Sequence, residues 1–188
     1  MWYPEFMSER APARMTADEF IAWAMERPRG ERYELAGGET VGMAPERAAH
    51  ARIKLLIARR LADAVEAAGL PCEVYTDGMA VEVDSDTVYE PDAMLRCGTP
   101  LPDDAIKASD PLIVVEVLSP STRARDAGAK LEDYFRLSSV VHYLIAKTEN
   151  QTIIHHRREP SGTIATTIIR GGPVRLDSPG IELHDLFA

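Results

Sequence analysis

The segment Leu112–Leu118, LIVVEVL, limits the possible folds of this chain more than any other segment. Apart from Glu116 it consists of Leu, Ile and Val. A near-continuous apolar run of this kind is typical of a strand that is covered on both faces. We therefore expect a strand in the interior of a sheet, with other elements packed on its two sides.

Glu116 interrupts this apolar run. An isolated ionised carboxylate inside an apolar strand is costly, so it must be paired, neutralised or bound to a cation. A structural alternative is a hydrogen bond to the region of Ser119 or Ser121, or a position at the strand end where the side chain points outward. Its location makes Glu116 the first candidate for a catalytic or cation-binding residue.

Asp92 is the second candidate and follows Pro91 in the segment YEPDAML. The proline predicts a bulge, edge or bend just before the acid. The chain between Asp92 and Glu116 is long enough for one strand to end and the next to pair beside it. Two such carboxylates can share a divalent cation, and hard oxygen ligands suit Mg²⁺ or Mn²⁺. Taken alone, Pro-Asp is equally typical of a turn.

Hydrophobic periodicity and turn residues predict the order of elements. The expected elements are a short helix after Thr16, a hairpin over 33–41, a helix over 45–68, strands over 72–77, 79–83 and 87–95, a loop over 96–111, the strand over 112–118, a helix over 126–137, a strand over 141–146 and a hairpin of edge strands over 152–158 and 163–170. This order predicts an α/β (α+β) fold with a mixed central sheet flanked by helices and additional β-hairpins.

Composition bounds the class of protein. The chain has 188 residues and is 45% hydrophobic, which is enough for one compact domain; we expect it over 15–188, after a flexible leader over 1–14. Thirty acidic residues against 21 basic ones give a net charge of −9, which excludes a protein that coats nucleic acid or anionic membranes by charge alone. Any contact with nucleic acid must be local.

Two cysteines, Cys72 and Cys97, are too few for a disulfide framework and lack CxxC spacing. This fits a reducing cytosol and excludes a thiolate zinc site. The apolar runs are far shorter than a membrane span, so we expect no membrane segment and a cytoplasmic protein.

The histidines predict no separate metal site. His155 and His156 are neighbours on an expected strand, so they point to opposite faces and cannot hold one ion together. His50 lies near the start of the long helix, where a surface or capping role is as compatible with the sequence as a catalytic one.

Several of these residues together resemble the Uma-type restriction endonuclease family, a former domain of unknown function in the PD-(D/E)XK nuclease superfamily. The resemblance rests on Pro91-Asp92, on Glu116 within VVEVLSPSTRARD and on Lys130 and Tyr134 further along; Glu34 in YELAGGE and His50 support it. It extends from about residue 15 to the end of the chain. The superfamily core of helix, three strands, helix and strand agrees with the predicted order between 45 and 146.

The resemblance implies a set of site residues. Asp92 and Glu116 match the two acids that bind Mg²⁺, and the main-chain carbonyl of Val117 is a candidate additional ligand. The superfamily lysine is replaced by Leu118, and Lys130 on the following helix matches its relocated counterpart. Glu34 matches an acid that helps to bind metal in related nucleases. Without the resemblance, Lys130 and Asp126 would be interpreted as an ordinary exposed ion pair.

The expected function is an Mg²⁺-dependent or Mn²⁺-dependent endonuclease that hydrolyses phosphodiester bonds in DNA. One alternative is a catalytically degenerate nuclease-like module that binds without cutting, and another is a hydrolase of a small phosphorylated molecule. Cleavage of both strands of a duplex favours a homodimer with two-fold symmetry. The sequence leaves the choice between DNA and RNA open.

Overall fold

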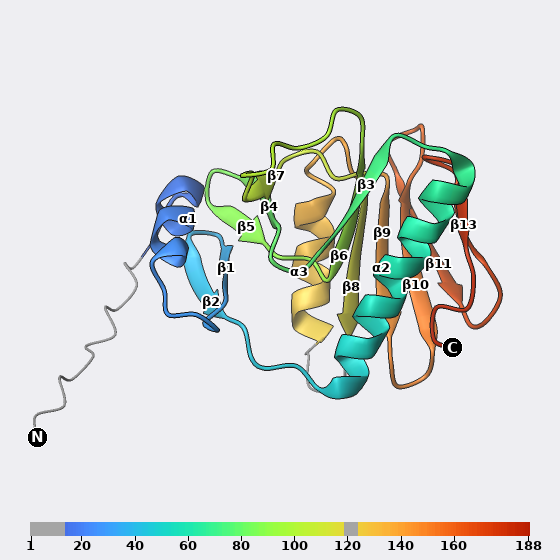
Figure 1. The fold of residues 1–188 in the computed structure, drawn as a ribbon, viewed down its shortest axis with the longest axis horizontal. Coiled ribbons are helices and arrows are strands. Elements are labelled where there is room, and N and C mark those ends of the chain that lie inside the picture. The colour runs from blue at the N-terminus through green and yellow to red at the C-terminus, as the bar shows by residue number, and fades with distance from the viewer. Residues whose placement is uncertain (1–13, 119–123) are drawn as a thin grey trace, which may run out of the picture.

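The computed structural model describes residues 14–118 and 124–188, apart from the side chains of 124–127 (Figure 1). The helices are α1 (Ala17–Met25), α2 (Ala48–Ala68) and α3 (Ala124–Tyr134). The strands are β1 (Tyr33–Ala36), β2 (Glu39–Gly42), β3 (Cys72–Thr76), β4 (Ala80–Asp84), β5 (Thr87–Tyr89), β6 (Ala93–Cys97), β7 (Lys107–Ala108), β8 (Ile113–Leu118), β9 (His142–Lys147), β10 (Thr152–Arg158), β11 (Ile164–Ile169), β12 (Val174–Leu176) and β13 (Ile181–Leu183). Apart from residue 14, the expected leader lies outside the described residues.

A six-stranded sheet with the order β11-β10-β9-β8-β6-β3 forms the centre of the fold. The expected interior strand is β8, which pairs in parallel with β9 and antiparallel with β6. Helix α2 lies along one face of this sheet (Figure 1). Helix α3 and residues of the second sheet pack on the other face. The mixed sheet flanked by helices confirms the predicted fold class.

The side chains of β8 alternate between these two faces. Val115 and Val117 pack in the same core cluster as Leu61 of α2. Val114 packs with Tyr134 of α3 in the cluster on the opposite face. Because side chains along a strand alternate, Glu116 points to the face that α3 covers.

A second sheet of five strands has the order β2-β1-β5-β4-β7. The single strand expected over 87–95 is wrong, because the chain leaves this sheet after β5 and enters the six-stranded sheet at β6. Pro91 lies at this crossing, where the sequence predicted a bulge, edge or bend before Asp92; proline has no N–H group to donate to a sheet. The expected loop over 96–111 contains the short strand β7.

The structure confirms one expectation about the hairpins and corrects another. Gly37 and Gly38 have φ values of 56° and 82°, as the predicted turn between β1 and β2 requires. In the later hairpin only β11 lies at the sheet edge, because β10 pairs with both β9 and β11.

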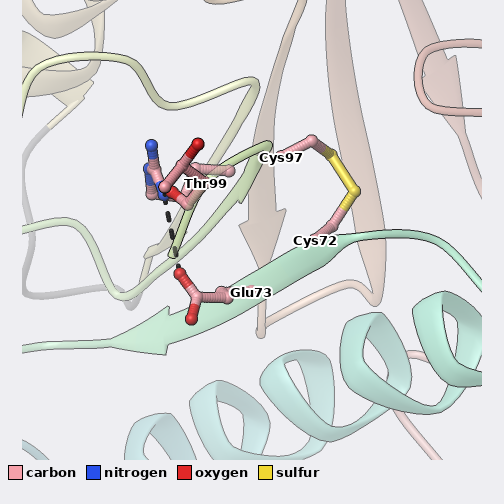
Figure 2. The surroundings of a disulfide bond; sticks show 5 residues. Cys72, Glu73, Cys97 and Thr99 are labelled. Atoms are coloured by element: carbon pink, nitrogen blue, oxygen red, sulfur yellow. Dashed lines mark hydrogen bonds and ion pairs between the residues drawn. A yellow bond between two sulfur atoms is a disulfide. The ribbon is translucent and has the colours of Figure 1, made fainter. Parts of the chain in front are cut away.

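Strands β3 and β6 are joined by a disulfide bond between Cys72 and Cys97 (Figure 2). The two residues lie directly opposite each other in the antiparallel register. Two cysteines are too few for a disulfide framework, but they form this one bond, which was not predicted from the sequence. The pairing depends on the register of two strands, which the spacing of cysteines along the chain does not reveal.

The C-terminal hairpin of β12 and β13 packs against α2. Leu183 of this hairpin and Leu186 after it belong to the same core cluster as the buried residues of α2. Within the described ranges, no helix combines the length and the apolar character that crossing a membrane requires.

Candidate active site

Asp92 lies between β5 and β6, and only 6% of its surface is exposed. Its Oδ2 accepts a hydrogen bond from the Val117 N–H at 2.6 Å and lies 3.2 Å from His50 Nε2. Its Oδ1 lies 3.2 Å from Lys54 Nζ. Burial raises the pKa of Asp92, but the hydrogen bonds from His50 and Val117 outweigh burial, and its pKa falls below the ordinary value. Asp92 is therefore anionic at neutral pH.

Glu116 is buried against α3. Its Oε1 accepts hydrogen bonds from Lys130 Nζ and from the Tyr134 hydroxyl, each at 3.0 Å. Burial raises the pKa of Glu116 to about 7, although the charge of Lys130 acts in the opposite direction. These two partners meet the need for pairing that the sequence predicted. The alternative partners Ser119 and Ser121 lie outside the described residues.

Lys130 forms ion pairs with one acid from each of the two sheets. Its Nζ lies 2.8 Å from Glu34 Oε1, on β1 of the five-stranded sheet, and 3.0 Å from Glu116 Oε1, on β8 of the six-stranded sheet. The same Glu34 oxygen accepts the N–H of Glu90 at 3.0 Å. Burial lowers the pKa of Lys130, but the charges of Glu116 and Glu34 outweigh it, so the pKa rises and the ammonium is charged. The side chain of Asp126, its alternative partner, is outside the described part of the chain.

The sequence reasoning missed a second lysine beside Asp92. Lys54 Nζ also bonds Glu46 Oε1 at 2.5 Å and lies 3.2 Å from Asp77 Oδ2. His50 and Lys54 are four residues apart on α2, which places them on one helix face, and Glu46 precedes the helix. His50, for which a surface role was open, is buried and contacts Asp92.

The acids line a cavity of about 660 Å³. Glu34, Asp92, Glu116 and Lys130 contribute to its charged wall, and Val117 also lines it. The segment from β2 to α2 also lines the cavity, with the apolar residues Val41, Met43, Ala44 and Pro45 and the charged residues Glu46 and Arg47. The structure thus brings all four predicted catalytic residues to one cavity, of a size typical of ligand sites.

The donor atoms of this cavity fit a hard divalent cation. Asp92, Glu116 and Glu34 line the cavity, and carboxylate oxygens are ligands that suit Mg²⁺ or Mn²⁺. In addition, Glu46, His50 and Asp92 offer ligand atoms that all lie within 4.8 Å of one another. The N–H of Val117 bonds Asp92, and the ligand role expected of its carbonyl stays a prediction.

Fold and site together define a class of protein. Helix α2, the antiparallel strands β3, β6 and β8, helix α3 and the parallel strand β9 reproduce the order of a restriction-endonuclease-like nuclease core. The Uma2 family model, described as "Putative restriction endonuclease", matches residues 17–184. The chain belongs to this family.

The chain is also similar to two individual proteins. The chain is 24% identical over 171 residues to the uncharacterized protein slr1290 of Synechocystis sp., a match that covers 90% of this chain and 88% of that protein. The crystal structure of a "putative nuclease belonging to DUF820" from Anabaena variabilis matches with a TM-score of 0.75 and 16% identity, over 92% of this chain and 97% of that one. The second match shows that the fold is shared.

Proposed function

We propose that the protein is a divalent-metal-dependent endonuclease that hydrolyses phosphodiester bonds in DNA. The observation that carries the proposal is that Asp92 and Glu116 line one cavity together with Lys130, which contacts Glu116. Membership of a nuclease family supports a nucleic acid as the substrate.

Asp92 and Glu116 are the residues that would hold the cation, with Glu34 and the Val117 carbonyl as further ligands. When bound, Mg²⁺ or Mn²⁺ acts as a Lewis acid on a phosphoryl oxygen and makes water more acidic. Asp92 is prepared for this role, because its lowered pKa keeps it anionic. Glu116, with its pKa raised to about 7, gains the most from a neighbouring cation, which favours its charged form.

Lys130 provides a positive charge at the site. Its ammonium lies beside Glu34 and Glu116, both of which line the cavity, so it can stabilise negative charge that develops on a phosphate there. Leu118 occupies the usual lysine position of the strand. The contact of Lys130 with Glu116 supports the proposal that α3 supplies this charge instead.

The proposed DNA contact is local and depends on the cation. The net charge of −9 predicts weak binding of DNA to the rest of the surface and a strong effect of metal on affinity. We propose a two-fold homodimer in which each copy cuts one strand of a duplex, since one such site acts on one strand at a time.

The direct test is cleavage of supercoiled plasmid with Mg²⁺ or Mn²⁺. Wild-type protein is expected to nick or linearise it, and Asp92→Asn or Glu116→Gln should lower the rate at least about 100-fold. Glu73→Gln, which removes an acid on β3 away from the cavity, is the matched control and should cut normally. A wild-type protein that binds DNA without cutting DNA or RNA would favour the non-cutting module. Cleavage of a model phosphodiester alone would favour a small-molecule hydrolase.

A further inference from the structure

We propose that Lys54 is a resident cation of this site: its ammonium lies between Asp92 and Glu46 and competes with the divalent metal for the Asp92 carboxylate. This inference rests on the proposed function. It makes Lys54 a positioning residue that sets how tightly the site binds metal.

The first support is the number of acids around one ammonium. Lys54 Nζ lies 2.5 Å from Glu46 Oε1, 3.2 Å from Asp92 Oδ1 and 3.2 Å from Asp77 Oδ2. Glu46 accepts a hydrogen bond from this ammonium, and Asp92 and Asp77 form ion pairs with it. Lys54 thus provides for Asp92 the kind of partner that a bound cation would provide.

The second support is the burial of this lysine. Lys54 is 6% exposed and does not line the cavity, whereas Glu46 and Asp92 do. A phosphate in the cavity would therefore meet Lys130 before Lys54. The influence of Lys54 must act through its acidic partners.

The third support is that Lys54 has an acidic partner outside the cavity, Asp77. Asp77 bonds Lys54 from the turn after β3, and this acid is not among the residues that line the cavity. Arg32 Nη1 holds the same Asp77 oxygen at 2.6 Å. Lys54 can therefore keep its bond to Asp77 while Asp92 and Glu46 turn to a divalent cation.

Electrostatic repulsion predicts that the charge of Lys54 weakens metal binding. An ammonium within a few ångströms of a divalent cation opposes its binding, and this repulsion is strong in a buried site. Removing the charge should therefore tighten metal binding, at least about tenfold in Kd. A lysine that served only to hold the fold together would have no such effect.

The test is Mn²⁺ binding by titration calorimetry or by the EPR signal of free Mn²⁺. Lys54→Met should bind Mn²⁺ at least about tenfold more tightly than wild type, and Asp92→Asn should lose this binding. The matched control is Lys107→Met, which removes a lysine charge from another acidic pair, Asp18 and Glu82, away from the cavity. That variant should stay within about twofold of wild type.

Two further measurements guard against a variant that fails to fold. Lys54→Arg keeps the charge and should bind Mn²⁺ no more tightly than wild type. In wild-type protein, saturation with Mg²⁺ should shift the NMR resonances of the Lys54 ammonium and leave those of Lys107 in place.

The outcomes separate this proposal from the proposed function. Unchanged or weaker Mn²⁺ binding by folded Lys54→Met, tighter binding by Lys54→Arg, or a Lys54 resonance unmoved by Mg²⁺ would overturn the role of Lys54 while the metal site stands. Absence of Mn²⁺ binding in wild type and Lys54→Met alike would overturn both.

Discussion

The ammonium of Lys130 lies 3.0 Å from a carboxylate oxygen of Glu116, so helix α3 delivers a positive charge to an acid on strand β8. Leu118 points to the same side of that strand two residues later. The superfamily would have its lysine at this second position. In this protein Lys130 on α3 places a positive charge beside Glu116 instead.

Replacing Lys130 by methionine should abolish most of the cleavage activity. The change removes the charge that Glu34 and Glu116 share, and loss of one such stabilising group lowers turnover by about 100-fold or more. Plasmid cleavage under metal saturation measures the effect, with Lys107→Met as the control. Near-normal cleavage by Lys130→Met would refute the assignment of this lysine.

Loss of the hydroxyl should cost more stability at Tyr134 than at the neighbouring Tyr143. The Tyr134 hydroxyl bonds Glu116, whereas the buried Tyr143 hydroxyl has no partner among the described residues. Tyr134→Phe should lower the free energy of unfolding by about 1–2 kcal/mol. Tyr143→Phe should lower it by no more than about 0.5 kcal/mol, because no hydrogen bond is lost. Urea denaturation provides both values, and equal losses would contradict the hydrogen-bond pattern.

Stability should fall in mild acid because of two buried histidines. His142 Nδ1 and His155 Nε2 lie 2.9 Å apart, and burial lowers the pKa of each from 6.5 to about 4. The folded protein therefore binds fewer protons than the unfolded chain in mild acid, and the two histidines together should lower the free energy of unfolding by about 4 kcal/mol between pH 7 and pH 5.

Urea denaturation of wild type at pH 7 and pH 5 measures this loss. The double variant His142→Asn and His155→Gln removes both titrating groups and leaves the carboxylates in place as an internal control. It should lose distinctly less stability than wild type over this range. An equal loss in the two proteins would place the acid sensitivity elsewhere.

Reduction of the disulfide should destabilise the fold. The bond between Cys72 and Cys97 closes a loop with a sequence separation of 25, and opening such a loop costs about 3 kcal/mol. Thermal unfolding with and without dithiothreitol measures the difference. A variant with both cysteines changed to serine should be insensitive to the reductant; a wild-type protein that is equally insensitive would contradict the cross-link.

The sequence predicted the parts of the fold that depend on local pattern. The apolar run around Glu116 identified the interior strand because burial on both faces leaves little room for polar residues. Pro91 predicted a break in the strand. At Pro91 the chain passes from one sheet to the other. This change depends on pairing between distant strands, which a local sequence pattern does not reveal.

The site was predictable only in part, for a similar reason. Glu116 could be found because a carboxylate inside an apolar strand is costly, Asp92 was a weaker candidate beside it, and Lys130 was singled out only by the family resemblance. Lys54 could not be found, because a lysine on an amphipathic helix usually faces solvent. Two of its acidic partners, Asp77 and Asp92, come from segments that meet only in the folded protein.

The most direct test of the central claim is anomalous diffraction from a crystal soaked in Mn²⁺. We expect a peak within about 2.5 Å of carboxylate oxygens of both Asp92 and Glu116. The peak should disappear in crystals of Asp92→Asn. A wild-type crystal with no Mn²⁺ at these two acids, from a protein that still cleaves DNA, would contradict the account.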